Sequence, residues 1–331
     1  MGIRKACGVV GIVVAAVWST GRAGDFERVE EKTFTMQPGG SVEIVADDGS
    51  VTIGAWGSPE VRVKMTMRAW SNSRVRAERA LDAQQIEIRS EGNRLEIREH
   101  GEGDERGSDF INVKRGSGDG DDGVSIDFEL SVPAQTDVEC ALDEGDIRVT
   151  GVSGSRVVLS SDEGDISLED AAVRTISLDT DEGDIEVSGV RAAGGSISLE
   201  TDEGGIRAEK CEADAFTADT DEGDVELISV KAQACSIATD EGEIEAFLDP
   251  VKSSVYTFEA GEGSVSVAVP EGASFRVQLE TGEGSVESDF RLSRESLDEG
   301  ELLEGRIGDG AGMLHVYTDE GDIVLTRRSV P

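Results

Sequence analysis

The sequence is poor in the residues that form most recognition and catalytic sites. Aromatic residues make up 4% of its 331 residues, and it has two histidines, His100 and His315. Scarce aromatics argue against a platform on which sugar rings or nucleic-acid bases stack. The chain has 31 Lys and Arg against 70 Asp and Glu, a formal charge of −39. Because nucleic acid and anionic membrane surfaces are bound through cationic contacts, both are excluded as partners.

Long apolar runs are also missing, apart from one near the amino terminus. Cys7 to Trp18 is apolar, but a membrane-spanning helix needs about 20 such residues. Arg4 and Lys5 precede the run, and small residues follow it up to Gly24. This order predicts a secretory signal peptide at residues 1–24, with an uncleaved amino-terminal anchor as the alternative. We therefore expect an exported protein, in the periplasm, at the cell surface or outside the cell.

What the sequence has in abundance is a repeat. The nine residues Asp179 to Val187 recur with small changes along most of the chain, and each copy is centred on a glycine. All intervals between these glycines except the last are 19 or 21 residues, and Gly300 is interpreted as a degenerate copy within that last interval. A fixed period of this length is typical of a solenoid or a repeated hairpin array. The turn glycines are Gly145, Gly164, Gly183, Gly204, Gly223, Gly242, Gly263, Gly284 and Gly321.

Each copy alternates apolar and polar residues on both sides of its glycine. Around Gly183, Ile176 and Leu178 come before it and Ile185 and Val187 after it, which is typical of strands with one buried face. The alternation breaks at Glu-Gly, so this dipeptide marks a corner where glycine can adopt positive φ. The sequence predicts an all-β, single-stranded β-solenoid of the β-helix type, with 19 to 21 residue coils stacked ~4.8 Å apart. An array of antiparallel hairpins turning at Glu-Gly is the alternative.

The first third of the chain is less regular. The residues around Gly49 match the repeat and form an outlying first copy. Ser71 or Ser73 caps the single predicted helix, Arg74 to Ala83, and residues 100–123, rich in Gly and Asp, are predicted to form an exposed loop. The predicted parts of the chain are a signal peptide at 1–24, an irregular amino-terminal β region at 25–137, regular β-solenoid repeats at 138–326 and a tail at 327–331.

Three cysteines remain after the predicted signal peptide: Cys140, Cys211 and Cys235. An odd number in an exported chain leaves at least one thiol unpaired within the monomer. Cys140 and Cys235 fall where other copies have Leu or Ile, so we predict small buried apolar side chains. A disulfide between Cys211 and Cys235 is the alternative, although the two residues differ in phase around the coil.

The repeated chemical feature is a ladder of acidic residues at the corners. Stacked like charges ~4.8 Å apart repel each other by on the order of 1 kcal/mol even in water. Calcium would relieve this repulsion because it accepts several carboxylate oxygens in flexible geometry. We predict weak, multivalent calcium binding along the ladder and no required cofactor, with a merely solubilising acidic face as the alternative. The candidate ligands are Asp143, Glu144, Asp162, Glu163, Asp165, Asp181, Glu182, Asp184, Asp221, Glu222 and Asp224.

A column of threonines lies three positions before the turn glycines. Leu142, Ala46 and Ala260 occupy the same column in other copies. The position is therefore predicted to lie inside or at the corner, where the hydroxyl satisfies the backbone of the turn. The threonines are Thr180, Thr201, Thr220, Thr239, Thr281 and Thr318.

A polysaccharide lyase or hydrolase built on a β-helix is the enzymatic alternative. Paired carboxylates can act as general acid and base, but such a site needs one pair whose environments differ. The same acids recur on every coil, so none is singled out. His315 alternates with the core positions Leu314 and Val316, as expected of an ordinary exposed residue. We predict no catalytic site.

Several features together resemble one known family. They are the signal peptide, the copy at Gly49, the strand Phe128 to Pro133, the tandem Thr-Asp-Glu-Gly-Asp-Ile units and the Gly-rich lead Gly305 to Gly310 into the final copy. The chain is similar to the putative-adhesin family of uncharacterised bacterial β-strand-repeat proteins, a domain of unknown function. The resemblance implies an exported β-solenoid with an adhesive role and no catalytic residues. We expect a non-enzymatic acidic interaction scaffold whose partner is a cell-surface or extracellular protein or glycan.

Overall fold

The structure, a computed structural model, describes residues 9–13, 25–99, 123–297 and 300–328. In these ranges it contains 27 strands and one helix, so the predicted all-β class is confirmed. The helix is too short and too polar to cross a membrane. The chain divides into two compact units, residues 1–154 with 159–163 and residues 155–158 with 164–331. The boundary predicted at residue 137 lies inside the first of these units.

The first unit begins with an antiparallel sheet and the helix. The strand β5 pairs with β2 on one side and with β8 on the other, and β1 adds to β2. The helix α1 (Arg74–Ala83) packs against β2, β5 and β8 and buries Ala77 and Leu81. Ser73 is its N-cap, although the Ser73 side chain makes no capping hydrogen bond. The strands of this unit are β1 (Val9–Val13), β2 (Asp25–Thr35), β3 (Gly40–Asp48), β4 (Val51–Trp56), β5 (Glu60–Trp70), β6 (Ile86–Glu91), β7 (Arg94–Glu99), β8 (Gly123–Pro133), β9 (Thr136–Glu144) and β10 (Ile147–Thr150).

The remainder of the first unit consists of the antiparallel pair β6 and β7 and of stacked coils. The strand β3 pairs in parallel with β7 and β9, and β4 pairs in parallel with β8 and β10. The copy at Gly49 therefore stacks directly on the coil of Gly145, far away in the sequence. Ile44 lies opposite Cys140 and Ile53 opposite Val149, and all four side chains are buried. The prediction of an outlying first copy is confirmed.

Two predicted segments fall largely outside the described residues. Of the predicted signal peptide, only residues 9–13 are described, as β1. Of the predicted loop at 100–123, only Gly123 is described, at the start of β8. Both assignments stay predictions.

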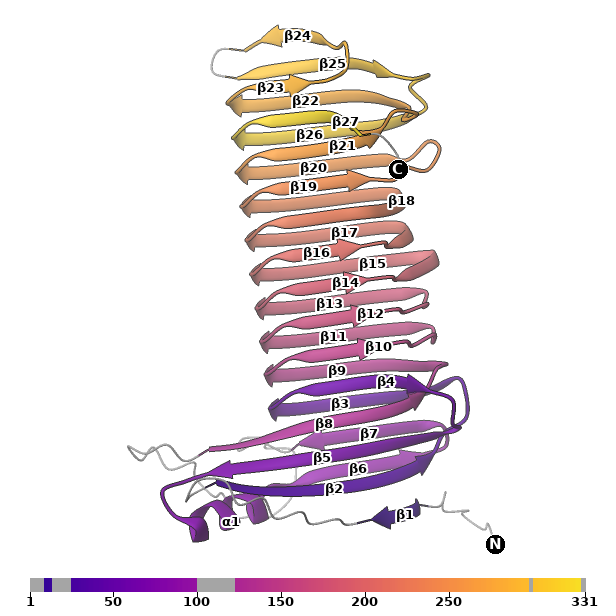
Figure 1. The fold of residues 1–331 in the computed structure, drawn as a ribbon, viewed down its shortest axis with the longest axis vertical. Helices are drawn as coiled ribbons and strands as arrows, with labels where there is room; N and C mark the ends of the chain where they lie inside the picture. The colour runs from indigo at the N-terminus through magenta and orange to yellow at the C-terminus, as the bar shows by residue number, and fades with distance from the viewer. Residues whose placement is uncertain (1–8, 14–24, 100–122, 298–299, 329–331) are drawn as a thin grey trace, which may run out of the picture. The chain divides into compact units, whose positions relative to one another are not determined.

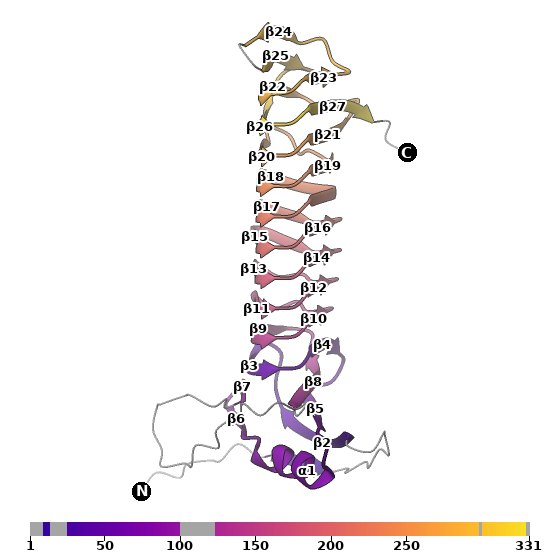
Figure 2. The ribbon, with the colours of Figure 1, turned by 90° about the vertical axis from the view of Figure 1, so that its left-hand side faces the viewer.

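In the second unit each coil contributes one strand to each of two sheets, and the strands of successive coils pair in parallel (Figure 1). Figure 2 shows the two sheets on opposite sides of the stacked coils. One sheet contains β13, β15, β17 and β20, the other β12, β14, β16, β19 and β21, and the long β18 passes from one sheet into the other. Since the coils pair in parallel, the hairpin alternative is wrong for them. The strands are β11 (Arg156–Glu163), which is divided between the two units, β12 (Ile166–Glu169), β13 (Thr175–Glu182), β14 (Ile185–Ser188), β15 (Arg191–Glu203), β16 (Ile206–Glu209), β17 (Glu212–Glu222), β18 (Val225–Glu241), β19 (Ile244–Leu248), β20 (Val255–Glu262), β21 (Val265–Pro270), β22 (Phe275–Glu283), β23 (Val286–Ser288), β24 (Ser293–Ser296), β25 (Glu301–Ile307), β26 (Gly312–Glu320) and β27 (Ile323–Arg328).

The core of the second unit is a set of apolar columns between the two sheets. Ile185 pairs with Ile206, and Ile206 with Val225, and each is at most 1% exposed. Burying a side chain of this size contributes about 1.5 to 3 kcal/mol. Because one coil cannot cover its own apolar face, the stack gains this energy only from neighbouring coils.

The carboxyl-terminal coils do not stack in chain order. The strand β26 lies between β20 and β22 and is parallel to both, and β27 lies in the same way between β21 and β23 (Figure 1). The coil of Gly321 is thus inserted between those of Gly263 and Gly284. The expectation that successive copies lie on top of one another is wrong at this end. The physical reason is that all copies present the same apolar columns, so either coil fits against β20 and β21.

Gly300 is not a corner, contrary to its interpretation as a degenerate copy. It precedes β25, which runs antiparallel to β22, and it packs against the carbonyl of Thr281. At the outer edge of β23, two side chains make the hydrogen bonds that a neighbouring strand would make. Arg294 Nη2 donates to the carbonyl of Val286 at 2.7 Å, and Glu301 Oε2 accepts the Val286 N–H at 3.0 Å. Arg294 and Glu301 also form an ion pair. Such a charged pair blocks the addition of another strand at this edge.

The three described cysteines are free and buried. The prediction of small apolar side chains is therefore confirmed, and the alternative disulfide between Cys211 and Cys235 is not formed. Burial raises the pKa of Cys211 to about 12 and also raises the pKa of Cys140 and of Cys235. These thiols are therefore unreactive at neutral pH, because the thiolate is the nucleophile.

Candidate functional site

The corners of the second unit depend on glycine. At Gly183 φ is +156° and at Gly204 it is +154°, values that residues with a Cβ rarely adopt. A Cβ at Gly204 would lie 2.1 Å from the carbonyl oxygen of Gly183 in the neighbouring coil. The coils can approach this closely only with glycine at the corner.

The threonine column satisfies the backbone of the corners, as predicted. Thr201 Oγ1 donates to the carbonyl of Gly183, and Thr220 Oγ1 donates to that of Gly204, both at 3.0 Å. These threonines are 1% and 2% exposed. Each hydroxyl therefore links one coil to the next inside the fold. The same bond is made by Thr180 to Gly164, Thr239 to Gly223, Thr281 to Gly321 and Thr318 to Gly263.

The aspartate that follows the corner glycine has a structural role. Asp165 Oδ1 accepts the N–H of Asp184 at 2.9 Å, and Asp184 Oδ1 accepts the N–H of Gly205 at 2.8 Å. Asp224 Oδ1 accepts the N–H of Glu243 at 2.8 Å in the same way. Hydrogen bonds to a charged acceptor are stronger than neutral ones. These carboxylates tie adjacent coils together and have one oxygen engaged in doing so.

The Asp-Glu pair that precedes the glycine faces solvent. Glu182 pairs in register with Glu203, and Glu203 with Glu222, so a carboxylate recurs at every strand spacing of ~4.8 Å. All eleven predicted ligands are exposed. The corners of the second unit carry Asp165, Asp181, Glu182, Asp184, Asp221, Glu222 and Asp224, and those of the first unit carry Asp143, Glu144, Asp162 and Glu163.

Repulsion within the ladder affects proton affinity. Partial burial, followed by the charges of Asp221 and Asp240, raises the pKa of Asp219. In the first unit, partial loss of hydration at this exposed residue, followed by the charges of Asp162 and Asp48, raises the pKa of Asp143. In the described part of the chain, no group of three or more His, Cys, Asp or Glu side chains is arranged to hold a metal ion. A cation at this edge would therefore have few protein ligands and would keep much of its water.

Glu99 is an unusual carboxyl group that sequence reasoning missed. Burial raises its pKa to about 7, and the charges of Asp47, Asp48 and Asp143 act in the same direction. Its Oε2 accepts the N–H of Asp47 at 3.3 Å, a bond that opposes the shift. Only the parallel pairing of β3 with β7 and β9 brings these acids together. No local signal in the sequence shows that Glu99 is partly buried.

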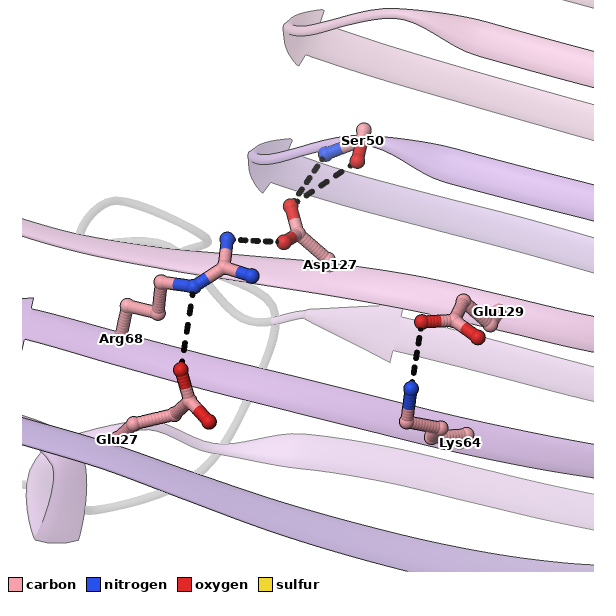
Figure 3. Close-up of polar contacts among 6 residues, drawn as sticks. All are labelled: Glu27, Ser50, Lys64, Arg68, Asp127 and Glu129. Carbon is pink, nitrogen blue, oxygen red and sulfur yellow. Dashed lines mark hydrogen bonds and ion pairs between the residues drawn. The ribbon is translucent and has the colours of Figure 1, made fainter. Parts of the chain in front are cut away.

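The corner at Gly49 has its own aspartate, which the repeat pattern did not reveal. Asp127 Oδ1 accepts both the N–H of Ser50 at 3.1 Å and its hydroxyl at 3.0 Å (Figure 3). Arg68 forms ion pairs with Asp127 and, at 3.6 Å, with Glu27. Asp127 thus does for this corner what the aspartate after glycine does in the second unit. Ile126 precedes it in place of glycine, so the sequence shows no corner there.

Comparison with known families identifies the fold. The model of the Toastrack DUF4097 family matches residues 58–326. The chain belongs to the Toastrack family. The resemblance drawn from the sequence, to a family of unknown function with a β-solenoid-like fold, is thereby confirmed.

Solved structures similar to this Toastrack protein share little sequence with it. A putative adhesin from Bacteroides fragilis is 8% identical, covering 90% of this chain and 97% of that one, with a TM-score of 0.43. A putative adhesin from Parabacteroides distasonis is 10% identical, covering 90% and 97%, with a TM-score of 0.48. A putative lipid binding protein from the same organism is 11% identical, covering 90% and 96%, with a TM-score of 0.40. Among curated proteins, none matches the sequence.

Proposed function

We propose that this Toastrack protein is a non-enzymatic interaction scaffold of the adhesin type, exported to the periplasm, the cell surface or the medium. The observation that carries the proposal is the register of the exposed corners, in which Glu182, Glu203 and Glu222 stack in one column. A surface that presents the same group on every coil makes many weak contacts at once, and their combined strength exceeds that of any single contact. The partner is a cell-surface or extracellular protein or glycan.

The equivalence of the corner acids supports a non-enzymatic role. Catalysis by two carboxylates needs environments that push their pKa values apart. The Asp-Glu pairs of the second unit are all exposed and repeat on the same backbone, so none is set apart from the others. Release of reducing sugar from a panel of neutral and acidic glycans would contradict this part of the proposal.

The same column is proposed to bind calcium weakly. Support comes from the stacking of like charges and from the raised pKa of Asp219. Partial burial is the main cause of this raised pKa, and the charges of Asp221 and Asp240 add to it. Calcium accepts carboxylate oxygens and water in flexible geometry, and the weak sites of extracellular modules have dissociation constants of about 10⁻⁴ to 10⁻³ M. Bound calcium would relieve repulsion along the column and bridge it to anionic groups of a partner.

The role of the corners is tested with two variants of equal charge. The purified chain is applied to an array of extracellular proteins and glycans, with and without calcium, and the heat of calcium binding is measured by titration. The corner variant carries Asp181→Asn, Glu182→Gln, Asp221→Asn and Glu222→Gln, and the control carries Glu186→Gln, Glu212→Gln, Asp214→Asn and Glu245→Gln, all at exposed positions.

We expect array binding and calcium heat to fall in the corner variant and to persist in the control. Array binding that is equal in both variants, or absent from the wild-type chain, contradicts the scaffold proposal. Absence of calcium heat at millimolar concentration contradicts the calcium proposal alone.

A further inference from the structure

The second unit has a groove that the acidic corners do not explain. It lies over β20, β26, β22, β25 and β24, which are neighbours in one sheet, and this open groove has a volume of about 640 Å³. Its lining includes Arg276, Arg306, His315, Gln278 and Met313. A volume in the range of about 300 to 1,000 Å³ is typical of sites for small molecules. In a chain with a formal charge of −39, a groove lined by two arginines is a local reversal of charge.

The two arginines lie directly opposite each other on neighbouring strands. Arg276 of β22 and Arg306 of β25 are register partners in the antiparallel pair, an arrangement that like charges normally destabilise. The aliphatic parts of both side chains lie beside Gly310. A Cβ added to Gly310 would be 3.4 Å from Cγ of Arg276 and 3.3 Å from Cδ of Arg306. Among the described residues, neither guanidinium forms an ion pair with a carboxylate. The pair is therefore free to bind an external anion.

Arg306 and Arg276 begin a row of register partners that runs across the strands, here called the arginine row, and exposed apolar side chains continue it. Met313 is the register partner of Arg276 on one side and of Val255 on the other. Met313, which lines the groove, is 46% exposed, and Val255, next to it outside the lining, is 43% exposed. Two strand spacings, ~10 Å in all, therefore separate Arg276 from Val255, and Arg306 lies one spacing further away.

A second row beside it is polar. His315 pairs with Gln278 and with Thr257, and Gln278 pairs with Glu304. Glu304 is the one acidic residue in the lining. Because it belongs to this second row, a bound anion is favoured on the arginine row. The groove thus combines a cationic end, an apolar end and a polar flank.

We propose that this groove binds a medium-chain carboxylate, with the carboxylate on Arg276 and Arg306 and the alkyl chain over Met313 and Val255. Guanidinium groups bind carboxylates through paired charge-assisted hydrogen bonds, and the ~10 Å from Arg276 to Val255 matches the length of such a chain. An acidic macromolecule is disfavoured, because the high negative charge of the protein repels it. A small anion feels mainly the nearby arginines, since salt screens charges beyond ~8 Å.

The test is calorimetric titration of the full chain with decanoate below its micelle concentration. We expect one saturable site. In the double variant Arg276→Gln and Arg306→Gln the affinity should fall at least about tenfold, because two charge-assisted contacts are lost. The matched control, Arg174→Gln with Arg191→Gln, changes two exposed arginines of the same unit outside this groove and should keep wild-type affinity.

Measurements on the wild-type chain alone also decide the matter. Acetate, which lacks the tail, and decan-1-ol, which lacks the charge, should each bind at least about tenfold more weakly than decanoate. The proposal is overturned if decanoate shows no saturable binding, if either partial ligand matches it, or if the control loses as much affinity as the groove variant. The groove and the corners share no residue, so its failure would leave the scaffold proposal intact.

Discussion

Each coil of the second unit turns twice, and the two turns are built differently. At the acidic corner, Gly183 has φ of +156° and no room for a Cβ. At the opposite turn, six residues after the corner glycine, φ is +51° at Asp170, +65° at Gly189, +55° at Lys210 and +57° at Ser229. The first value is open to glycine alone, whereas the second region is reached by other residues at a modest cost. The repeat is therefore strict at one turn and variable at the other.

This difference separates the two sides of the coil chemically. Because the backbone of the acidic corner has the same conformation in each coil, the residues next to its glycine occupy equivalent positions, and threonine and the acids recur in columns. The variable turn carries no such column, and its residues differ in charge from coil to coil. A surface that repeats is suited to multivalent contacts, and in this unit only the corner side repeats its charge.

The strict corner is where we expect the largest loss of stability. Gly204→Ala should destabilise the chain by about 3 to 6 kcal/mol, because it adds backbone strain and a clash with the carbonyl of Gly183. Gly194→Ala is the matched control, since φ there is +68° and its Cβ would meet only Arg174 Nη2 at 3.9 Å. It should cost about 1 kcal/mol. Chemical denaturation measures both, and equal losses would break the comparison between the turns.

A second comparison concerns acids near a corner of the first unit, where the partly buried Glu99 lies beside the corner at Gly49 and Glu91 is exposed. The pKa of Glu99 in the folded chain, about 7, exceeds its ordinary value of 4.5. The folded state therefore binds more protons between these values, and this group's contribution to stability falls as pH rises from about 4.5 to 7. Glu99→Gln should remove that slope and stabilise the chain at pH 8 by on the order of 1 to 3 kcal/mol.

Denaturation at pH 4, 6 and 8 measures this effect. Glu91→Gln, at an exposed acid of the same unit, is the control and should leave the pH dependence unchanged. A variant Glu99→Gln with the wild-type pH dependence would show that the carboxyl group is solvated.

A third comparison sets the inward threonine against an outward one. Thr220→Val keeps the shape of the side chain and removes the bond to the carbonyl of Gly204, which should cost about 1 to 2 kcal/mol. Thr175 is exposed, so Thr175→Val should change stability by less than about 0.5 kcal/mol. Melting temperatures of the two variants measure the difference. Similar values would mean that the hydroxyl column contributes nothing.

The smallest expected effect separates the two kinds of corner acid. Asp184→Ala removes the acceptor for the N–H of Gly205 and should cost about 0.5 to 1 kcal/mol. Asp181→Ala removes an exposed carboxylate and should be neutral within about 0.5 kcal/mol. Denaturation at low and high salt distinguishes a hydrogen bond from general repulsion, since salt weakens only the latter. A reversed order of the two variants would contradict the structural role of the aspartate after glycine.

The sequence was sufficient to predict what depends on one coil and its neighbours. Period, corner glycine and alternation around Gly183 all have local causes, and the threonine column was correctly placed because Leu142 and Ala260 share it. The predicted ladder, however, treated Asp184 and Glu182 as equivalent. Their different roles depend on side-chain direction, which the repeat does not encode.

The order of the last coils could not be predicted for a related reason. Thr281 and Thr318 occupy the same column, so the two copies present nearly identical faces to β20 and β21. The sequence pattern alone therefore does not determine which of the two coils stacks directly on β20 and β21. The antiparallel β25, which has no counterpart in the repeat, pairs with the outer edge of β22. The partly buried Glu99 and the arginine pair of the groove likewise arise from pairings between distant segments.

The central claim, that corners stack in register with the coil of Gly321 inserted before that of Gly284, is tested most directly by distances between spin labels. Labels are placed at exposed corner glutamates, Glu182 with Glu320 and Glu182 with Glu283, since the buried native cysteines do not react. Register places Glu320 five coils and Glu283 six coils from Glu182, which predicts separations of ~24 Å and ~29 Å. A shorter distance to Glu283 than to Glu320 would contradict the account.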